Sequence, residues 1–200
     1  SENKDTIIPF SPDKIIDFDV VRKFNCGYLF LQDIYYDLKI DAICRHIKNK
    51  YSFDFDINAI LSDLVFSRIL FPSSKRSTYE QAHSLLEQPK YELHDVYRAL
   101  SILSKESDYI QAELYKNSHF IKKRNTSTLY YDCTNYYFEI EEDDDLRKYG
   151  KSKEHRPNPI IGMGLMMDGD GIPLAFDMYE GNKNEQLTLK PLEKRIIKDF

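Results

Sequence analysis

The sequence predicts an α+β chain in which a helical region precedes a short β-sheet and one further helix. Through about the first 120 positions, apolar residues recur at helical spacing. Beyond residue 128 the pattern changes to short apolar and aromatic runs separated by turn residues, which is typical of strands. A polar, basic stretch at 122–127 separates the two patterns. We therefore expect a helical region over 1–125 and a mixed region over 126–200.

Helices in the first region are predicted from the period of their apolar residues. Leu31, Ile34, Tyr35 and Leu38 begin the first pattern, which continues to about residue 48. The same reasoning predicts helices over 57–70, 79–86, 96–103 and 106–120, with prolines punctuating the segments between them.

The run 129–138 is the first expected strand, and it places Asp132 among aromatic and β-branched residues. No Lys or Arg interrupts this run. Burying an unpartnered carboxylate costs several kcal/mol, so we expect Asp132 to be paired or to bind a cation. Two interpretations stay open: an Asp that hydrogen-bonds neighbouring backbone, and an Asp that ligates a metal ion.

Two further strands are expected over 160–167 and 172–179, flanking Asp168-Gly169-Asp170-Gly171. Asp and Gly between apolar runs are a strong hairpin signal. Asp168 and Asp170 are therefore interpreted as turn formers rather than metal ligands. Gly181-Asn182 then breaks the chain, and apolar residues at helical spacing predict a helix from about 189 to 200.

Composition narrows the class of protein. The chain has 200 residues, of which 42% are hydrophobic, enough for one sizeable core or two small ones. No apolar run approaches bilayer length and no signal peptide is recognisable, which favours a soluble, cytoplasmic protein without a membrane partner. Cys26, Cys44 and Cys133 are widely spaced, so free thiols are expected. The net charge of −5 argues against bulk attraction to DNA as the whole explanation of any DNA binding.

An acidic block and a basic block lie side by side between the first two expected strands. Residues 139–145 hold six acids, and residues 147–156 hold five Lys or Arg. One interpretation is a solvated loop whose charges neutralise each other. The other is that the basic half contacts a phosphate backbone while the acidic half stays solvated. Glu139 either begins an acidic surface run or comes within reach of a metal ion, and His155 adjoins the basic residues.

A polar turn over 72–78 separates two of the expected helices. Its hydroxyls and its two cations, Lys75 and Arg76, suit either phosphate contact or helix capping, with Ser77 or Thr78 as the expected cap. Two short helices around such a turn also fit a helix-turn-helix, although the pattern is generic.

Several motifs, in their order along the chain, resemble insertion-sequence transposases of the DDE class, which have an RNase H-like catalytic domain. Tyr131-Asp132-Cys133-Thr134 with Tyr137-Phe138-Glu139 is similar to the family's first catalytic strand. Further similar segments are Gly150-Lys151-Ser152-Lys153 with Arg156-Pro157, Gly171-Ile172-Pro173-Leu174 with Gly181-Asn182 and Thr188-Leu189, and, in the helical region, 68–75 and 96–100.

The resemblance implies a function. The family uses two Asp and one Glu to hold two divalent ions, Mg²⁺ or Mn²⁺, for DNA cleavage and strand transfer in transposition. Asp132 matches the first Asp, and the other two carboxylates are expected beyond residue 200. By this resemblance the chain is an N-terminal fragment that contains only the first part of an RNase H-like core. We expect the fragment alone to have no catalytic activity.

The resemblance also implies partners: DNA, and a second copy of the protein in a homodimer. The expected DNA-binding residues are Lys151, Lys153 and Arg156, together with Lys75 and Arg76 of the helical region. The helical region would bind DNA or dimerise. An alternative from another class is a non-catalytic DNA-binding or oligomerisation module derived from a degenerate transposase.

Overall fold

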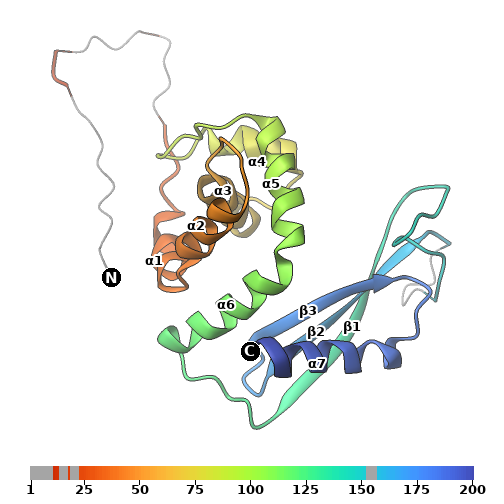
Figure 1. The fold of residues 1–200 in the computed structure, drawn as a ribbon. Helices are drawn as coiled ribbons and strands as arrows, with labels where there is room; N and C mark the ends of the chain where they lie inside the picture. Colours follow the sequence, from red (N-terminus) through yellow and green to blue (C-terminus); the bar gives the residue numbers. More distant parts are fainter. Residues whose placement is uncertain (1–10, 14–17, 19–22, 152–156) are drawn as a thin grey trace. The chain divides into compact units, whose positions relative to one another are not determined.

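A computed structural model describes residues 11–13, 18, 23–151 and 157–200 (Figure 1). Over these residues it contains seven α-helices, a short 3₁₀ helix and one three-stranded antiparallel sheet, which confirms the α+β class. Two compact units are separated between Ser104 and Lys105. The last helix of the expected helical region therefore groups with the sheet rather than with the helices before it.

The first unit holds five helices. They are α1 (Leu29–Asp37), α2 (Ile40–Lys50), α3 (Ile57–Leu70), α4 (Lys75–Ala82) and α5 (Leu93–Lys105). The single helix predicted over 31–48 is wrong, because Lys39 has φ 53° and separates α1 from α2. The apolar spacing already widens to five residues between Leu38 and Ile43, so the two halves of the pattern do not share one helix face.

The start of α4 also corrects the expected cap. Ser74 lies just before the helix, and its Oγ accepts a hydrogen bond from the Ser77 backbone N–H at 3.2 Å. Ser77 and Thr78 are therefore inside α4, and Thr78 is buried. By contrast, α3 has the predicted bounds, with Asp56 accepting from the N–H groups of Asn58 and Ala59.

Aromatic rings and the buried carboxylate of Asp63 lie in the core of this unit. Tyr28 and Tyr35 both pack on Phe66, with ring centroids 5.6 and 5.5 Å apart. Asp63 is buried on α3 and accepts a hydrogen bond from the Tyr91 hydroxyl at 2.7 Å. Burial raises the pKa of Asp63 to about 6, although the Tyr91 hydrogen bond acts in the opposite direction.

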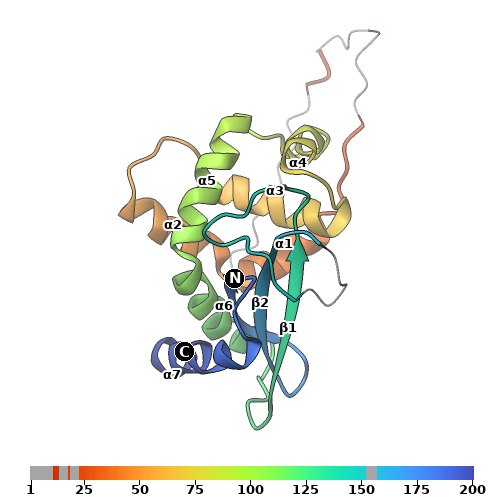
Figure 2. The ribbon, with the colours of Figure 1, turned by 90° about the vertical axis from the view of Figure 1, so that its right-hand side faces the viewer.

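The second unit contains α6 (Ser107–Ile121), β1 (Leu129–Tyr137), β2 (Ile160–Asp168), β3 (Pro173–Glu180) and α7 (Leu189–Asp199). A 3₁₀ helix, η1 (Glu185–Leu187), precedes α7. The strand order is β1-β2-β3, so β1 forms one edge of the sheet (Figure 2). All three predicted strands and the final helix are confirmed, with ends within two residues of those expected.

The core of this unit lies between α7 and one face of the sheet. Met166, Leu174 and Ala175 pack against Leu192 of α7, and Tyr115 of α6 closes the cluster. The pairing of β2 with β3 shifts register between Met166 and Met167, where Leu174 has no cross-strand partner. This bulge brings both Leu174 and Ala175 into the core, which regular alternation would prevent.

The hairpin turn confirms the turn-forming interpretation of Asp168. Its Oδ1 accepts hydrogen bonds from the backbone N–H groups of Asp170 and Ile172, at 3.0 and 2.9 Å. Gly171 has φ 77°, a conformation that favours glycine. The three cysteines are free, as expected. Among the described helices, none combines the length and the apolar character needed to cross a membrane.

Candidate functional site

Asp132 lies near the middle of β1, opposite Leu165 of β2. Its neighbour Tyr131 faces α7, because the Tyr131 hydroxyl lies 2.5 Å from Thr188 Oγ1. Side chains alternate along a strand, so Asp132 projects from the opposite face of the sheet. The carboxylate is exposed there.

Other residues on this face of β1 are exposed as well. Tyr130 and Tyr136 flank Asp132 on the same face and are 53% and 47% exposed. An aromatic run therefore indicated a strand correctly but not a strand covered on both faces. Asp132 still has an interaction within the chain, so it is exposed but not isolated.

The described residues supply few other metal ligands near Asp132. Among them, no group of three His, Cys, Asp or Glu side chains is placed to hold a metal ion. Glu139 lies beyond the end of β1, seven residues from Asp132, which is roughly 23 Å along an extended chain. Asp132 therefore offers one carboxylate, and the described residues around it do not complete a metal site.

Two glycines bring together segments that are far apart in the sequence. Lys148 pairs with Ile160 at the start of β2 through two backbone hydrogen bonds of 3.0 and 2.8 Å. Just beyond, a Cβ atom on Gly150 would lie 2.0 Å from the Gly181 carbonyl oxygen, and one on Gly181 would lie 2.1 Å from the Ile160 carbonyl oxygen. Only glycine permits backbones to cross this closely.

The charged loop that leads to this crossing, residues 139–151, contains two ion pairs between residues that are close in sequence. Asp144 accepts hydrogen bonds from the backbone and side chain of Arg147, which hold the pKa of its carboxyl down at about 2. Asp143 lies 3.5 Å from the ammonium of Lys148. The solvated-loop interpretation therefore fits Arg147 and Lys148. Lys151 is exposed, whereas Lys153, Arg156 and His155 lie outside the described residues.

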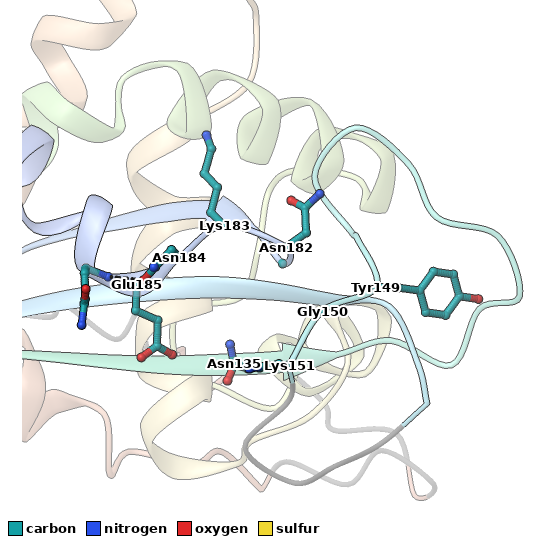
Figure 3. Close-up of a pocket in the computed structure, with 10 residues that line it drawn as sticks. Asn135, Tyr149, Gly150, Lys151, Asn182, Lys183, Asn184 and Glu185 are labelled. Carbon is teal, nitrogen blue, oxygen red and sulfur yellow. Dashed lines mark hydrogen bonds between the residues drawn. The ribbon is translucent and has the colours of Figure 1, made fainter.

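Beside the crossing, the second unit has an open cleft of about 680 Å³. Three parts of the chain form it: β1 supplies Asn135, the charged loop supplies Lys151, and the segment after β3 supplies most of the rest (Figure 3). In Figure 3 the Tyr149 ring points away from the other labelled side chains. The lining residues are Asn135, Tyr149, Gly150, Lys151, Gly181, Asn182, Lys183, Asn184, Glu185 and Gln186.

Several polar groups in the cleft are already engaged. Lys183 lies 3.4 Å from Glu180, and Asn184 Oδ1 accepts the Gln186 backbone N–H at 3.0 Å. Asn135 Oδ1 is buried, and no donor among the described residues reaches it. The cleft thus presents carboxamides, the Lys151 ammonium and the Glu185 carboxylate.

The structure brings together only part of the predicted site. Lys151 and Asn182, from two of the matched motifs, line the same cleft, but Asp132 does not line it. Asn135 shares the α7-side face with Tyr131, so it lies on the face of β1 opposite to Asp132. Sequence reasoning missed Asn135 and Glu185; the signal available for Asn135 was its place in the Asp132 strand, on the alternate face.

Lys75 and Arg76 belong to the first unit, at the start of α4. Arg76 Nε lies 3.3 Å from Glu80 one turn later, which explains it as a helix-surface ion pair. Partial burial and the nearby Arg68 lower the pKa of Lys75. Arg68 is therefore close enough to act on Lys75, and sequence reasoning did not include Arg68 among the DNA-binding residues.

Comparison with protein-family models, curated proteins and solved structures found no match for this chain.

Proposed function

We propose that this chain is part of a DNA transposase of the DDE class and that Asp132 is one of its metal-ligating carboxylates. The observation that carries the proposal is the exposed position of Asp132 near the middle of β1, on the sheet face opposite the α7 core. A carboxylate on an exposed face can be approached by a polynucleotide. The order of strand, loop, hairpin and helix also supports the resemblance.

Asp132 would hold Mg²⁺ or Mn²⁺ together with carboxylates from the rest of a longer protein. Mg²⁺ sites in phosphoryl-transfer enzymes use one or two carboxylates, several waters and the substrate phosphates. The bound ion supplies charge stabilisation and activates the attacking oxygen. Since the described residues do not complete such a site, we expect the chain alone to cleave and join no DNA.

Lys151 supports the DNA-binding part of the proposal, because it is exposed beside the crossing of the two matched motifs. We propose that Lys153 and Arg156 extend this contact, and that Lys75 and Arg76 contact DNA from the first unit. Contacts of this kind position the phosphate backbone without reading sequence. They are expected to make binding depend steeply on salt concentration.

A non-catalytic DNA-binding or oligomerisation module is the second candidate. It is favoured by the lack of a three-ligand metal group among the described residues and by exposed apolar side chains on α1. Phe30 and Ile34 lie one turn apart on that helix and are 83% and 53% exposed. A homodimer through such a surface fits either candidate.

The deciding experiment is Asp132→Asn in the full-length protein, with Asp145→Asn as the matched control from the exposed acidic block. DNA cleavage with Mg²⁺ and binding to element-end DNA are measured in parallel. We expect Asp132→Asn to lose cleavage while binding persists, and the control to retain both. Cleavage retained by Asp132→Asn would reject the catalytic assignment, and no cleavage by the unsubstituted protein would favour the module.

A further inference from the structure

The chemistry of the cleft does not resemble that of a simple anion site. Carboxamides from Asn135, Asn182, Asn184 and Gln186 outnumber its cations, and Glu185 adds a negative charge. The Glu185 carboxylate repels a bare phosphate. The cleft has a volume of about 680 Å³, which is in the range of sites for complete small molecules. The occupant is therefore expected to have a polar, largely uncharged part.

Nucleobase edges fit such a lining. A carboxamide donates and accepts at once, so Asn and Gln form paired hydrogen bonds with a base edge, and a carboxylate accepts from an exocyclic amino group. The buried Asn135 Oδ1 has no donor among the described residues, and its amide lines the same cleft. The side chains of Asn182 and Glu185 are exposed to solvent there, with no hydrogen bond to a described residue that would occupy them.

A phosphate attached to that base also has a partner at the same site. Lys183 lies 3.4 Å from Glu180, whereas Lys151 is an exposed cation of the cleft that comes from the charged loop. The Gly150–Gly181 crossing holds the Lys151 segment against the Asn182 segment, so the cation and the carboxamides lie in one cleft. A base and its own phosphate are covalently linked, and the cleft offers chemistry for both.

We propose that this cleft binds one unpaired nucleotide of a DNA strand, with its base against the carboxamides and Glu185 and its phosphate at Lys151. A base inside a duplex has its Watson–Crick edge occupied, so it must leave the stack before it enters such a site. The identification of the polymer as DNA rests on the proposed function. The cleft itself is separate from Asp132, which projects from the other face of β1.

The test measures binding of the full chain to labelled strands of roughly 12 nucleotides, a typical length for single-strand binders. Three ligands are compared: a natural single strand, the corresponding duplex, and a strand of equal length in which every position is abasic. We expect the natural single strand to bind at least about tenfold more tightly than the abasic strand, as one good set of base contacts provides. The duplex is expected to bind more weakly than the single strand.

Variants separate the base from the phosphate. The double variant Asn182→Ala with Glu185→Gln should weaken binding of the natural strand and leave the abasic strand unchanged. Lys151→Ala should weaken both, whereas Lys198→Ala, an exposed lysine on α7, should weaken neither. All four positions are exposed, and circular dichroism checks that the variants fold.

Equal affinity for natural and abasic strands, a preference for duplex, no measurable binding, or no effect of the double variant would each overturn the proposal. The outcome is distinguishable from failure of the proposed function. Asp132→Asn is expected to leave single-strand binding unchanged, so loss of the catalytic assignment and loss of the cleft assignment appear in different measurements.

Discussion

Arg124 and Asp168 form a buried ion pair, with Arg124 Nε 2.7 Å from Asp168 Oδ2 and both side chains almost fully excluded from solvent. The same guanidinium donates to Ser118 Oγ of α6 at 2.7 Å and to the Ile172 and Pro173 carbonyl oxygens at 3.0 and 2.9 Å. It therefore ties the end of α6 and the segment entering β1 to the β2–β3 turn. Hydrogen bonds from Arg124 hold the pKa of Asp168 at about 2.

The first prediction concerns this pair. Arg124→Met leaves a buried carboxylate without its cation, which is among the most destabilising changes available to a folded domain. We expect the thermal unfolding midpoint of the second unit to fall by roughly 10 °C or more. The control is Lys123→Met, because the neighbouring lysine is exposed and its loss should move the midpoint little.

The pH dependence of the same unit follows from the direction of the Asp168 shift. A carboxyl whose pKa is lower in the folded state stabilises the fold above its unfolded pKa of about 4. That stabilisation is lost as the pH falls from about 4 towards 2. Unfolding of Arg124→Met, monitored by circular dichroism, should depend less on acid pH than unfolding of the unsubstituted protein does. An unchanged acid slope would mean that Asp168 is not held by Arg124 in solution.

The buried Asp63 predicts the opposite pH dependence in the first unit. Its pKa is raised to about 6, so the folded state binds the proton more tightly than the unfolded chain does. The contribution of Asp63 to the free energy of unfolding is therefore greatest below about pH 4. It declines as the pH rises through 6, by about 3 kcal/mol at most. Denaturant unfolding between pH 4 and 8 measures the slope.

Asp63→Asn tests this assignment, since an amide oxygen still accepts from the Tyr91 hydroxyl but carries no charge. We expect the variant to lose the decline and to be more stable than the unsubstituted protein at pH 8. Asp41→Asn, which removes a carboxylate paired on the surface of α2, should keep the decline. Equal slopes for Asp63→Asn and the unsubstituted protein would contradict the prediction.

These buried charges show where sequence reasoning succeeds and where it stops. Strands β2 and β3 and the turn at Gly171 were predictable, because turn chemistry and apolar runs are local signals. Arg124 was not: within the basic stretch 122–127 it looks like its exposed neighbours. Its partner Asp168 lies 44 residues away, and pairing over that distance leaves no local pattern.

The same limit applies to the candidate site. Asp132 was identifiable from its strand, but its exposure depends on which face α7 covers, and the run of aromatic residues does not specify that. The cleft was not predictable either, because Asn135 and Lys151 meet only through the Gly150–Gly181 crossing. A glycine in a loop indicates that another segment approaches closely, but the sequence does not show which segment that is.

The crossing itself gives the third prediction. Gly150→Ala places a methyl group 2.0 Å from the Gly181 carbonyl oxygen, so one of the two segments must move. We expect a loss of stability of about 1–3 kcal/mol, as for other overpacked sites, and weaker single-strand binding because the Lys151 segment is displaced. Gly27→Ala is the control, since its methyl group would meet only the Asn25 side chain at 3.3 Å. Unfolding and binding are measured on the same samples.

The outer edge of β3 gives the last prediction. Gln111 Oε1 accepts the Phe176 N–H at 2.7 Å, and Arg195 Nη2 donates to the Phe176 carbonyl oxygen at 2.6 Å, so side chains from α6 and α7 satisfy the edge strand. Gln111→Ala removes the acceptor of the Phe176 N–H. If that N–H stays buried without an acceptor, the loss of stability is about 1–3 kcal/mol. Amide hydrogen exchange at Phe176 should accelerate, while Gln88→Ala, an exposed glutamine of the first unit, should leave it unchanged. Unaltered exchange at Phe176 in Gln111→Ala would mean that the helix does not protect this edge in solution.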